Sequence, residues 1–328
     1  MPQSNRTIVP LVTAVCAATF AALSLAATAQ SYPSKPIRVV VPFPPGGVDV
    51  TIRQMQTVMT NDLGQQLVID NRAGANGYIG SEMVARAAPD GYTILATSVA
   101  LVTGPAITKA PFDVVKDFAP ITQIFTTVGA VVVKPSLPVN NIRELIDYAK
   151  KFPGKLSYGT SGIGSAQHID GEMLKLIAGI DMVHVPYKGG GPQIQAIVAQ
   201  EVDISFFPMQ QIRQHIVTGK AKMIATYDGK RYAGMPNIPD TTETLPEYRR
   251  LPGWVGVFGP AGLPRPVLQR LYAAMAKALG TPEVRALMEE NSVVVGNAPE
   301  EFAAIIRAEA ERAVKVVQDL RARGVQFE

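Results

Sequence analysis

The chain has 328 residues, with 31 Lys and Arg against 27 Asp and Glu, a formal net charge of +4 and a single cysteine. That length allows two domains with separate cores. The charge is scattered, without the basic run that is typical of nucleic-acid binding, and a single cysteine excludes an internal disulfide. We therefore expect no nucleic-acid partner and a stability that comes from packing.

The first 29 residues have the pattern of a secretory signal peptide. They contain no acidic residue, one arginine at position 6, an apolar stretch over residues 8–27 and a small-residue ending at 27–29. This pattern predicts cleavage before Gln30 and a periplasmic location, although a stretch of this length also suits an uncleaved membrane anchor. Cleavage at this position would remove Cys16. No later stretch is typical of a membrane span.

Strand and helix patterns alternate after the leader. Residues 37–41 are a β-branched run between two prolines, which predicts a buried parallel strand. A helix capped by Asp49 is expected to follow, because apolar residues recur at helical spacing up to Leu63. Strands at 67–69 and 93–96 with a helix at 78–88 complete a βαβαβ order, which predicts a parallel sheet.

The pattern then breaks and resumes. Residues 105–120 read as irregular, and two extended segments at 121–125 and 128–133 predict the crossing to a second lobe. Four more strands alternate with helices that begin near Ser165, Pro192 and Met209, and a strand at 255–258 returns the chain to the first lobe. We predict an α/β fold of two lobes, each a doubly wound, mainly parallel sheet flanked by helices. Lobe 1 would comprise residues 30–127 and 253–328, and lobe 2 residues 128–252.

Two glycine-rich loops each open a helix directly after a strand. They occupy residues 41–47 (VPFPPGG) and 158–165 (YGTSGIGS). A helix start carries unpaired N–H groups and the positive end of the helix dipole, and glycine lets an anion approach the backbone closely. Each loop alone is equally well explained as a tight turn. Because one loop lies in each lobe, the pair predicts that a carboxylate is held from both sides.

Motifs of known enzymes are incomplete in this chain. The double glycine at 46–47 lacks the Gly-Lys-Ser/Thr of a phosphate-binding loop, and residues 159–163 lack the last glycine of a nucleophile elbow. The three histidines, at 168, 184 and 215, have no metal-ligand spacing. We therefore expect a binding protein rather than an enzyme, with no catalytic residues, no cofactor and no metal.

Several polar side chains near the second loop are candidates for ligand contact. His168 lies in the first turn of the helix, where it could bond to an anion or to the loop itself, whereas His184 is expected in the core or on a sheet face. The hydroxyls of Thr160, Ser161 and Ser165 could contact the ligand, cap the helix, or do both.

Seven segments in order resemble one known family. They are residues 32–37 (YPSKPI), 42–47 (PFPPGG), 88–92 (APDGY), 116–120 (KDFAP), 164–168 (GSAQH), 183–189 (VHVPYKG) and 256–262 (GVFGPAG). No single segment is decisive, but the series resembles the substrate-binding proteins of tripartite tricarboxylate transporters, the Bug or TctC type, over nearly the whole mature chain.

The resemblance implies a two-lobed periplasmic-binding-protein fold, also called a Venus flytrap. Such a protein captures a small organic carboxylate and delivers it to membrane permease subunits, and we expect it to act as a monomer. A sensor that reports to a membrane kinase would bind its ligand in the same way, and an exported hydrolase is a further alternative. Carried over by position, the first loop would contribute Phe43, Pro45, Gly46 and Gly47, and the second Thr160, Ser161, Gly164 and Ser165, with His168 nearby.

Two departures from the family pattern bear on the ligand. After Ser98, which we expect in the site, apolar residues occupy 99–101 where relatives carry polar ones, and Phe207 stands where relatives place an Asp. Fewer polar partners argue against a charge-dense ligand, so we expect a carboxylate with an aromatic or apolar body. The alternative is that Phe207 turns into the core.

Overall fold

The structure is a computed structural model that describes residues 32–327, apart from residues 233, 249, 251–252 and 290–291. The predicted signal peptide, residues 1–29, lies outside the described residues. Within the described ranges, no helix has the length and apolar character that a membrane crossing requires.

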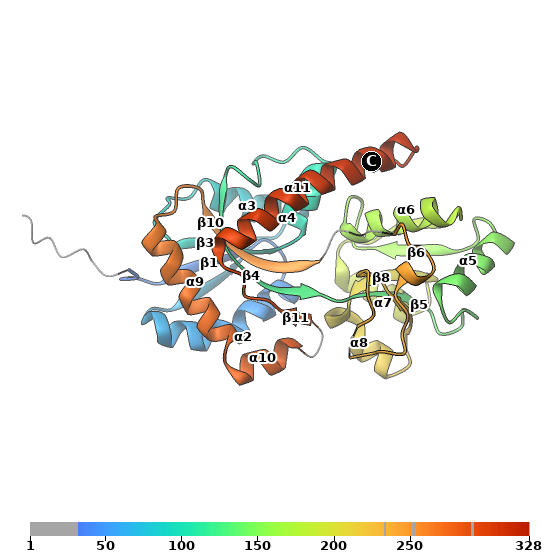
Figure 1. Ribbon diagram of the computed structural model, residues 1–328, viewed down its shortest axis with the longest axis horizontal. Coiled ribbons are helices and arrows are strands. Elements are labelled where there is room, and N and C mark those ends of the chain that lie inside the picture. The colour runs from blue at the N-terminus through green and yellow to red at the C-terminus, as the bar shows by residue number, and fades with distance from the viewer. Residues whose placement is uncertain (1–31, 233, 249, 251–252, 290–291, 328) are drawn as a thin grey trace, which may run out of the picture. The chain divides into compact units, whose positions relative to one another are not determined.

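The described residues form two sheets (Figure 1). The first has six strands in the order β11-β4-β10-β3-β1-β2, and the second has five in the order β7-β6-β8-β5-β9. The first sheet contains β1 (Ile37–Val41), β2 (Leu67–Asn71), β3 (Thr93–Ser98), β4 (Phe118–Thr127), β10 (Trp254–Pro260) and β11 (Ser292–Val294). The second contains β5 (Gly129–Val133), β6 (Ser157–Thr160), β7 (Val183–Pro186), β8 (Ile204–Pro208) and β9 (Lys222–Thr226).

Helices connect most of the strands. In chain order they are α2 (Gly47–Leu63), α3 (Tyr78–Ala85), α4 (Ala100–Ile107), α5 (Ile142–Lys151), α6 (Ala166–Ala178), α7 (Gly190–Val198), α8 (Met209–Val217), α9 (Arg265–Leu279), α10 (Pro282–Glu289) and α11 (Pro299–Ala322). Short 3₁₀ turns lie at Ala75–Gly77 and Thr241–Glu243. The order of elements therefore agrees with the predicted α/β class.

Both sheets are mixed, which corrects the expectation of mainly parallel sheets. β1 pairs in parallel with β2 and β3, and β6 with β7 and β8, as the βαβ pattern predicts. However, β10 runs antiparallel to β3 and β4, and β5 runs antiparallel to β8 and β9. These are the strands at which the chain enters a sheet from the other sheet, so no crossover helix forces them to be parallel.

The helix α4 is an element that the sequence analysis missed. It contains Pro105 at its sixth position, which was read as the start of an irregular stretch. Proline removes one helical hydrogen bond. The helix forms nevertheless because Leu101, Val102 and Ile107 are buried, the first two in the cluster beside the first sheet and Ile107 in the cluster beside the second.

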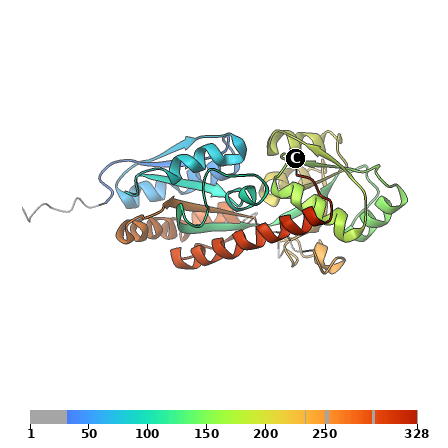
Figure 2. The ribbon, with the colours of Figure 1, turned by 90° about the horizontal axis from the view of Figure 1, so that it is seen from above.

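The long helix α11 packs on both halves of the chain. Phe302, Ile306 and Ala313 belong to a buried cluster with residues of the first sheet, whereas Val317 and Leu320 belong to the cluster of the second. Both views show α11, in red, running from the first sheet towards α6 (Figures 1 and 2), and these helices are in contact. Because the helix joins both clusters, the lobe boundaries stay predictions.

Candidate functional site

The first glycine loop joins β1 to α2, which begins at Gly47. Gly46 has a φ of 134°, which residues with a side chain rarely adopt, and no side chain caps the helix. In the part of the chain that the structure describes, no hydrogen bond uses the N–H groups of Gly47 and Val48. The loop is exposed from Pro44 to Gly47. These amides lie at the positive end of the helix dipole, and the loop can therefore seat an anion.

Two side chains that were not predicted as site residues support the first loop. The side-chain amide of Asn71, at the end of β2, donates to the Phe43 carbonyl at 3.0 Å. Asp49 is not the predicted helix cap but lies buried in the first turn of α2, where Arg53 donates to it at 2.9 and 3.0 Å. The guanidinium of Arg53 balances a carboxylate that would otherwise repel an anion at this helix start.

The second glycine loop joins β6 to α6, and its hydroxyls hold the loop itself. The Ser165 side chain caps α6 by accepting from the N–H of His168 at 3.3 Å, which confirms the capping role. The Ser161 hydroxyl donates to the Gln167 side chain at 3.0 Å, and the Ser161 carbonyl accepts from the N–H of Gly189 at 3.1 Å. This loop is therefore tied to the glycine-rich start of α7.

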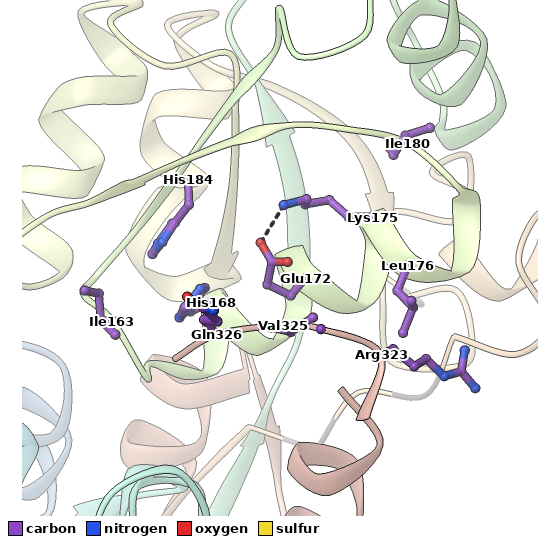
Figure 3. Close-up of a pocket in the computed structure, with 11 residues that line it drawn as sticks. Ile163, His168, Glu172, Lys175, Leu176, Ile180, His184, Arg323, Val325 and Gln326 are labelled. Carbon is purple, nitrogen blue, oxygen red and sulfur yellow. Dashed lines mark hydrogen bonds and ion pairs between the residues drawn. The ribbon is translucent and has the colours of Figure 1, made fainter. Parts of the chain in front are cut away.

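Two stacked histidines lie beneath the second loop (Figure 3). The rings of His168 and His184 are 4.0 Å apart and nearly parallel, at 12°. Nδ1 of His168 accepts from the N–H of Gly164 at 3.1 Å, which confirms the predicted bond to the loop. The hydroxyl of Thr160, which is fully buried, shares a hydrogen bond of 2.7 Å with Nε2 of His184. Thr160 thus supports the loop and offers no exposed hydroxyl to a ligand.

Burial keeps both rings uncharged. It lowers the pKa of His168, and burial together with the neighbouring His168 ring lowers the pKa of His184 to about 4. Both rings are therefore neutral at pH 7. A neutral imidazole can accept at one nitrogen and donate at the other, as the Gly164 contact requires.

We expect His184 to make the protein less stable as the pH falls from 6.5 towards 4. In this range the unfolded chain binds a proton that the folded ring does not, so the free energy of unfolding falls with pH. The expected loss is of order 1 kcal/mol, because solvent reaches the half-buried ring. Urea unfolding at pH 7.5 and pH 4.5, compared between the wild type and His184→Gln, measures it. An equal loss in both proteins would contradict the prediction.

Phe207 and the apolar residues Val99 and Leu101, which follow Ser98, are buried in hydrophobic clusters. Phe207 is fully buried in a cluster with Ala130 and Met209, which corrects the expectation that its ring lines the site. Val99 and Leu101 are also buried, in the cluster beside the first sheet. Ser98 is half-buried at the end of β3, and its hydroxyl accepts from the N–H of Ala100 at 3.4 Å.

The described contacts thus form two groups. One group joins Phe43 to Asn71 around the first loop, and the other joins the second loop to the histidine pair. A Cβ added to Gly164 would lie 3.2 Å from Ile107, so the second loop lies against the end of α4. The opposition of the two loops across a ligand stays a prediction. Among the described residues, no three His, Cys, Asp or Glu side chains lie close enough to hold a metal ion.

Known proteins resemble this chain over nearly its whole length. The family model of the tripartite tricarboxylate transporter family receptor, TctC, matches residues 51–322. A Pseudomonas relative, the UPF0065 protein in the tcbD-tcbE intergenic region, is 36% identical over 300 residues, which cover 89% of this chain and 88% of the relative.

Solved structures agree with this likeness. A structure of a periplasmic transporter, 36% identical, has a TM-score of 0.83 and covers 91% of this chain and 100% of that one. The Rhodopseudomonas palustris protein Rpa4515 with adipate, 28% identical, has a TM-score of 0.82 and covers 88% of this chain and 98% of that one. The predicted periplasmic-binding-protein fold is confirmed, and this chain belongs to the TctC family of periplasmic solute-binding receptors.

Proposed function

We propose that this protein binds a small organic carboxylate between its two glycine loops and delivers it to the membrane subunits of a tripartite transporter. The observation that carries the proposal is the pair of helix starts, α2 and α6, each opened by glycines at the end of a strand. At α2 the first N–H groups have no partner among the described residues, so they are available to a carboxylate. The adipate-bound relative supports this ligand class.

The ligand that we propose is an aliphatic carboxylate. The expectation of an aromatic or apolar body depended on Phe207 and on residues 99–101. Since Phe207, Val99 and Leu101 are packed in cores, they give no reason for an aromatic preference. The N–H groups at the start of α2 that bond to no described residue instead favour a carboxylate at the first loop, and the adipate-bound relative supports an aliphatic body.

The proposed partners are the permease subunits, because receptors of this family serve a transporter. A sensor kinase is the second candidate, since a sensor would bind the same ligand with the same residues. Purification of the tagged protein from membranes in the presence of ligand distinguishes them: a many-spanning permease subunit supports transport, and a kinase supports sensing. The proposal includes no catalysis, so the ligand is expected to be recovered unchanged after incubation.

We expect Gly46→Val and Ser161→Ala to weaken adipate binding at least about tenfold, which corresponds to about 1.4 kcal/mol. Valine is strained at the φ of 134° that Gly46 adopts, so the first loop must change shape. Loss of the Ser161 hydroxyl removes the contact to Gln167 that orders the second loop. Isothermal titration calorimetry with adipate, malate and benzoate measures both the affinity and the preferred class.

Gly219→Val is the matched control for backbone strain. Gly219 has a φ of 69°, is exposed after α8 and has no neighbour within 4 Å of an added Cβ. This variant should bind adipate like the wild type. If Gly46→Val and Gly219→Val bind equally well, the first loop is not part of the site. If benzoate binds and the aliphatic acids do not, the proposed ligand class is wrong.

A further inference from the structure

A cavity of about 470 Å³ lies beside α6, away from the first glycine loop. Its wall is formed by α6, by His184 on β7 and by residues 323–326, which follow α11 (Figure 3). No residue of 41–47 lines it, so it is not part of the anion seat at α2. The volume suits a molecule of roughly ten to twenty non-hydrogen atoms.

The cavity contains a buried hydrogen-bond donor. His168 lines it and is only 3% exposed. Because Nδ1 of His168 accepts from the N–H of Gly164, and because burial lowers the pKa of the ring, the proton of the neutral imidazole lies on Nε2. No hydrogen bond in the described ranges uses Nε2. The ring therefore offers one N–H group that a bound acceptor can use.

The charges on the wall leave one cation in excess. Glu172, which is 8% exposed, accepts from Lys175 at 3.0 Å and from the Tyr158 hydroxyl at 2.5 Å, so these acidic and basic groups compensate each other. The guanidinium of Arg323 has no ion pair or hydrogen bond with any residue that the structure describes. Figure 3 shows the two histidines towards one end of the cavity and Arg323 towards the other.

Besides Gln326, the remaining side chains of the wall are aliphatic. Ile163, Leu176, Ile180 and Val325 contribute their side chains, and Ile163 is 51% exposed at the rim. A wall with one uncompensated cation, one free donor and several aliphatic side chains complements a ligand with one negative charge and an apolar body. A compact dianion such as malate would leave the aliphatic wall without a partner and one of its charges unbalanced.

We propose that this cavity is a second binding site, separate from the first glycine loop, for an organic monoanion with an apolar body. The anionic group would contact Arg323, and the ligand would accept a hydrogen bond from Nε2 of His168. The body would cover Leu176 and Ile180. The site shares Ile163 and His168 with the second glycine loop and its helix, but Gly46 and Gly47 take no part in it, so it can be tested apart from the first loop.

The test uses 1-anilinonaphthalene-8-sulfonate, a monoanion with an aromatic body whose fluorescence rises in apolar surroundings. The wild type is expected to bind one molecule saturably, with unchanged affinity in excess malate. Arg323→Glu should weaken binding at least tenfold because it reverses the charge. Leu176→Trp should also weaken it at least tenfold because it fills the cavity.

Two controls make the result specific. Arg307→Glu reverses an exposed arginine within α11 that does not line the cavity, and Gly46→Val alters the first loop, which does not line it either. Both should bind the probe within twofold of the wild type. Binding that survives in both Arg323→Glu and Leu176→Trp would overturn the proposal. Binding that is lost in Gly46→Val or displaced by malate would also overturn it, since the probe would then lie at the first loop.

Discussion

Replacing Arg250 by Met is expected to lower the free energy of unfolding by about 3–5 kcal/mol, because it leaves a half-buried carboxylate without its partner. The Arg250 side chain is 8% exposed, and Nε donates to Asp228 at 2.7 Å. Its Nη2 donates to the Thr127 carbonyl at 3.0 Å, while Asp228 also accepts from the N–H of Gly129 at 2.7 Å. The Arg250–Asp228 pair thus binds the backbone at the end of β4 and at the start of β5.

The control for Arg250 is an exposed ion pair of the same chemistry. Arg231 donates to Glu243 at 2.7 and 2.6 Å, but both side chains are more than 40% exposed. Arg231→Met should therefore cost about 1 kcal/mol or less. Urea unfolding followed by circular dichroism measures both variants. If both variants lose the same free energy of unfolding, burial of the Arg250–Asp228 pair does not increase the effect of breaking it.

Gly171→Ala is expected to destabilise the protein by about 1–3 kcal/mol and to weaken carboxylate binding. A Cβ at Gly171 would lie 2.3 Å from the ring of Tyr158, which is fully buried and whose hydroxyl bonds to Glu172. Neither group can give way, so α6 must move away from β6. Because the second loop ends in the cap of α6, it must move with the helix.

Gly191→Ala is the matched control for Gly171. Gly191 also lies in a helix, at the start of α7, with no neighbour within 4 Å of an added Cβ and no unusual φ. Alanine favours a helix, so this variant should be as stable as the wild type or slightly more so. Thermal unfolding and adipate titration test both variants. A Gly171→Ala protein with unchanged melting temperature would contradict the close packing of α6 on Tyr158.

The local elements of this fold could be predicted because their signals are local. The β-branched run at β1, the glycines at 46 and 47 and the Ser165 cap lie within a few residues of the structures that they specify. The direction of a strand within its sheet has no such signal, which explains why mainly parallel sheets were expected although β5 and β10 run antiparallel to their neighbours. The alternation of apolar and polar residues along a strand indicates which of its faces is buried, but it does not indicate which strand lies beside it or in which direction that strand runs.

The candidate site was predicted less completely than the fold. Phe207 was placed at the site from the family pattern, yet a strand buried on both faces leaves no outward position, and Phe206 and Phe207 lie in different clusters. Asn71 was missed because its contact is set by packing between elements, and 28 residues separate it from Phe43. Arg53 lies only four residues from Asp49, but an i,i+4 ion pair on a helix is common and does not by itself mark a site. His168 was found because its partner is only four residues away.

The burial of α11 in two clusters holds those clusters together. Phe302 and Ile306 anchor one end of a continuous helix, and Val317 and Leu320 anchor the other. Separation of the two clusters would expose one of these ends to water. The Arg321 guanidinium also donates to the Ile107 carbonyl at 2.7 Å, which ties the C-terminal end of α11 to the end of α4. The apolar surface that α11 buries in each cluster therefore opposes their separation.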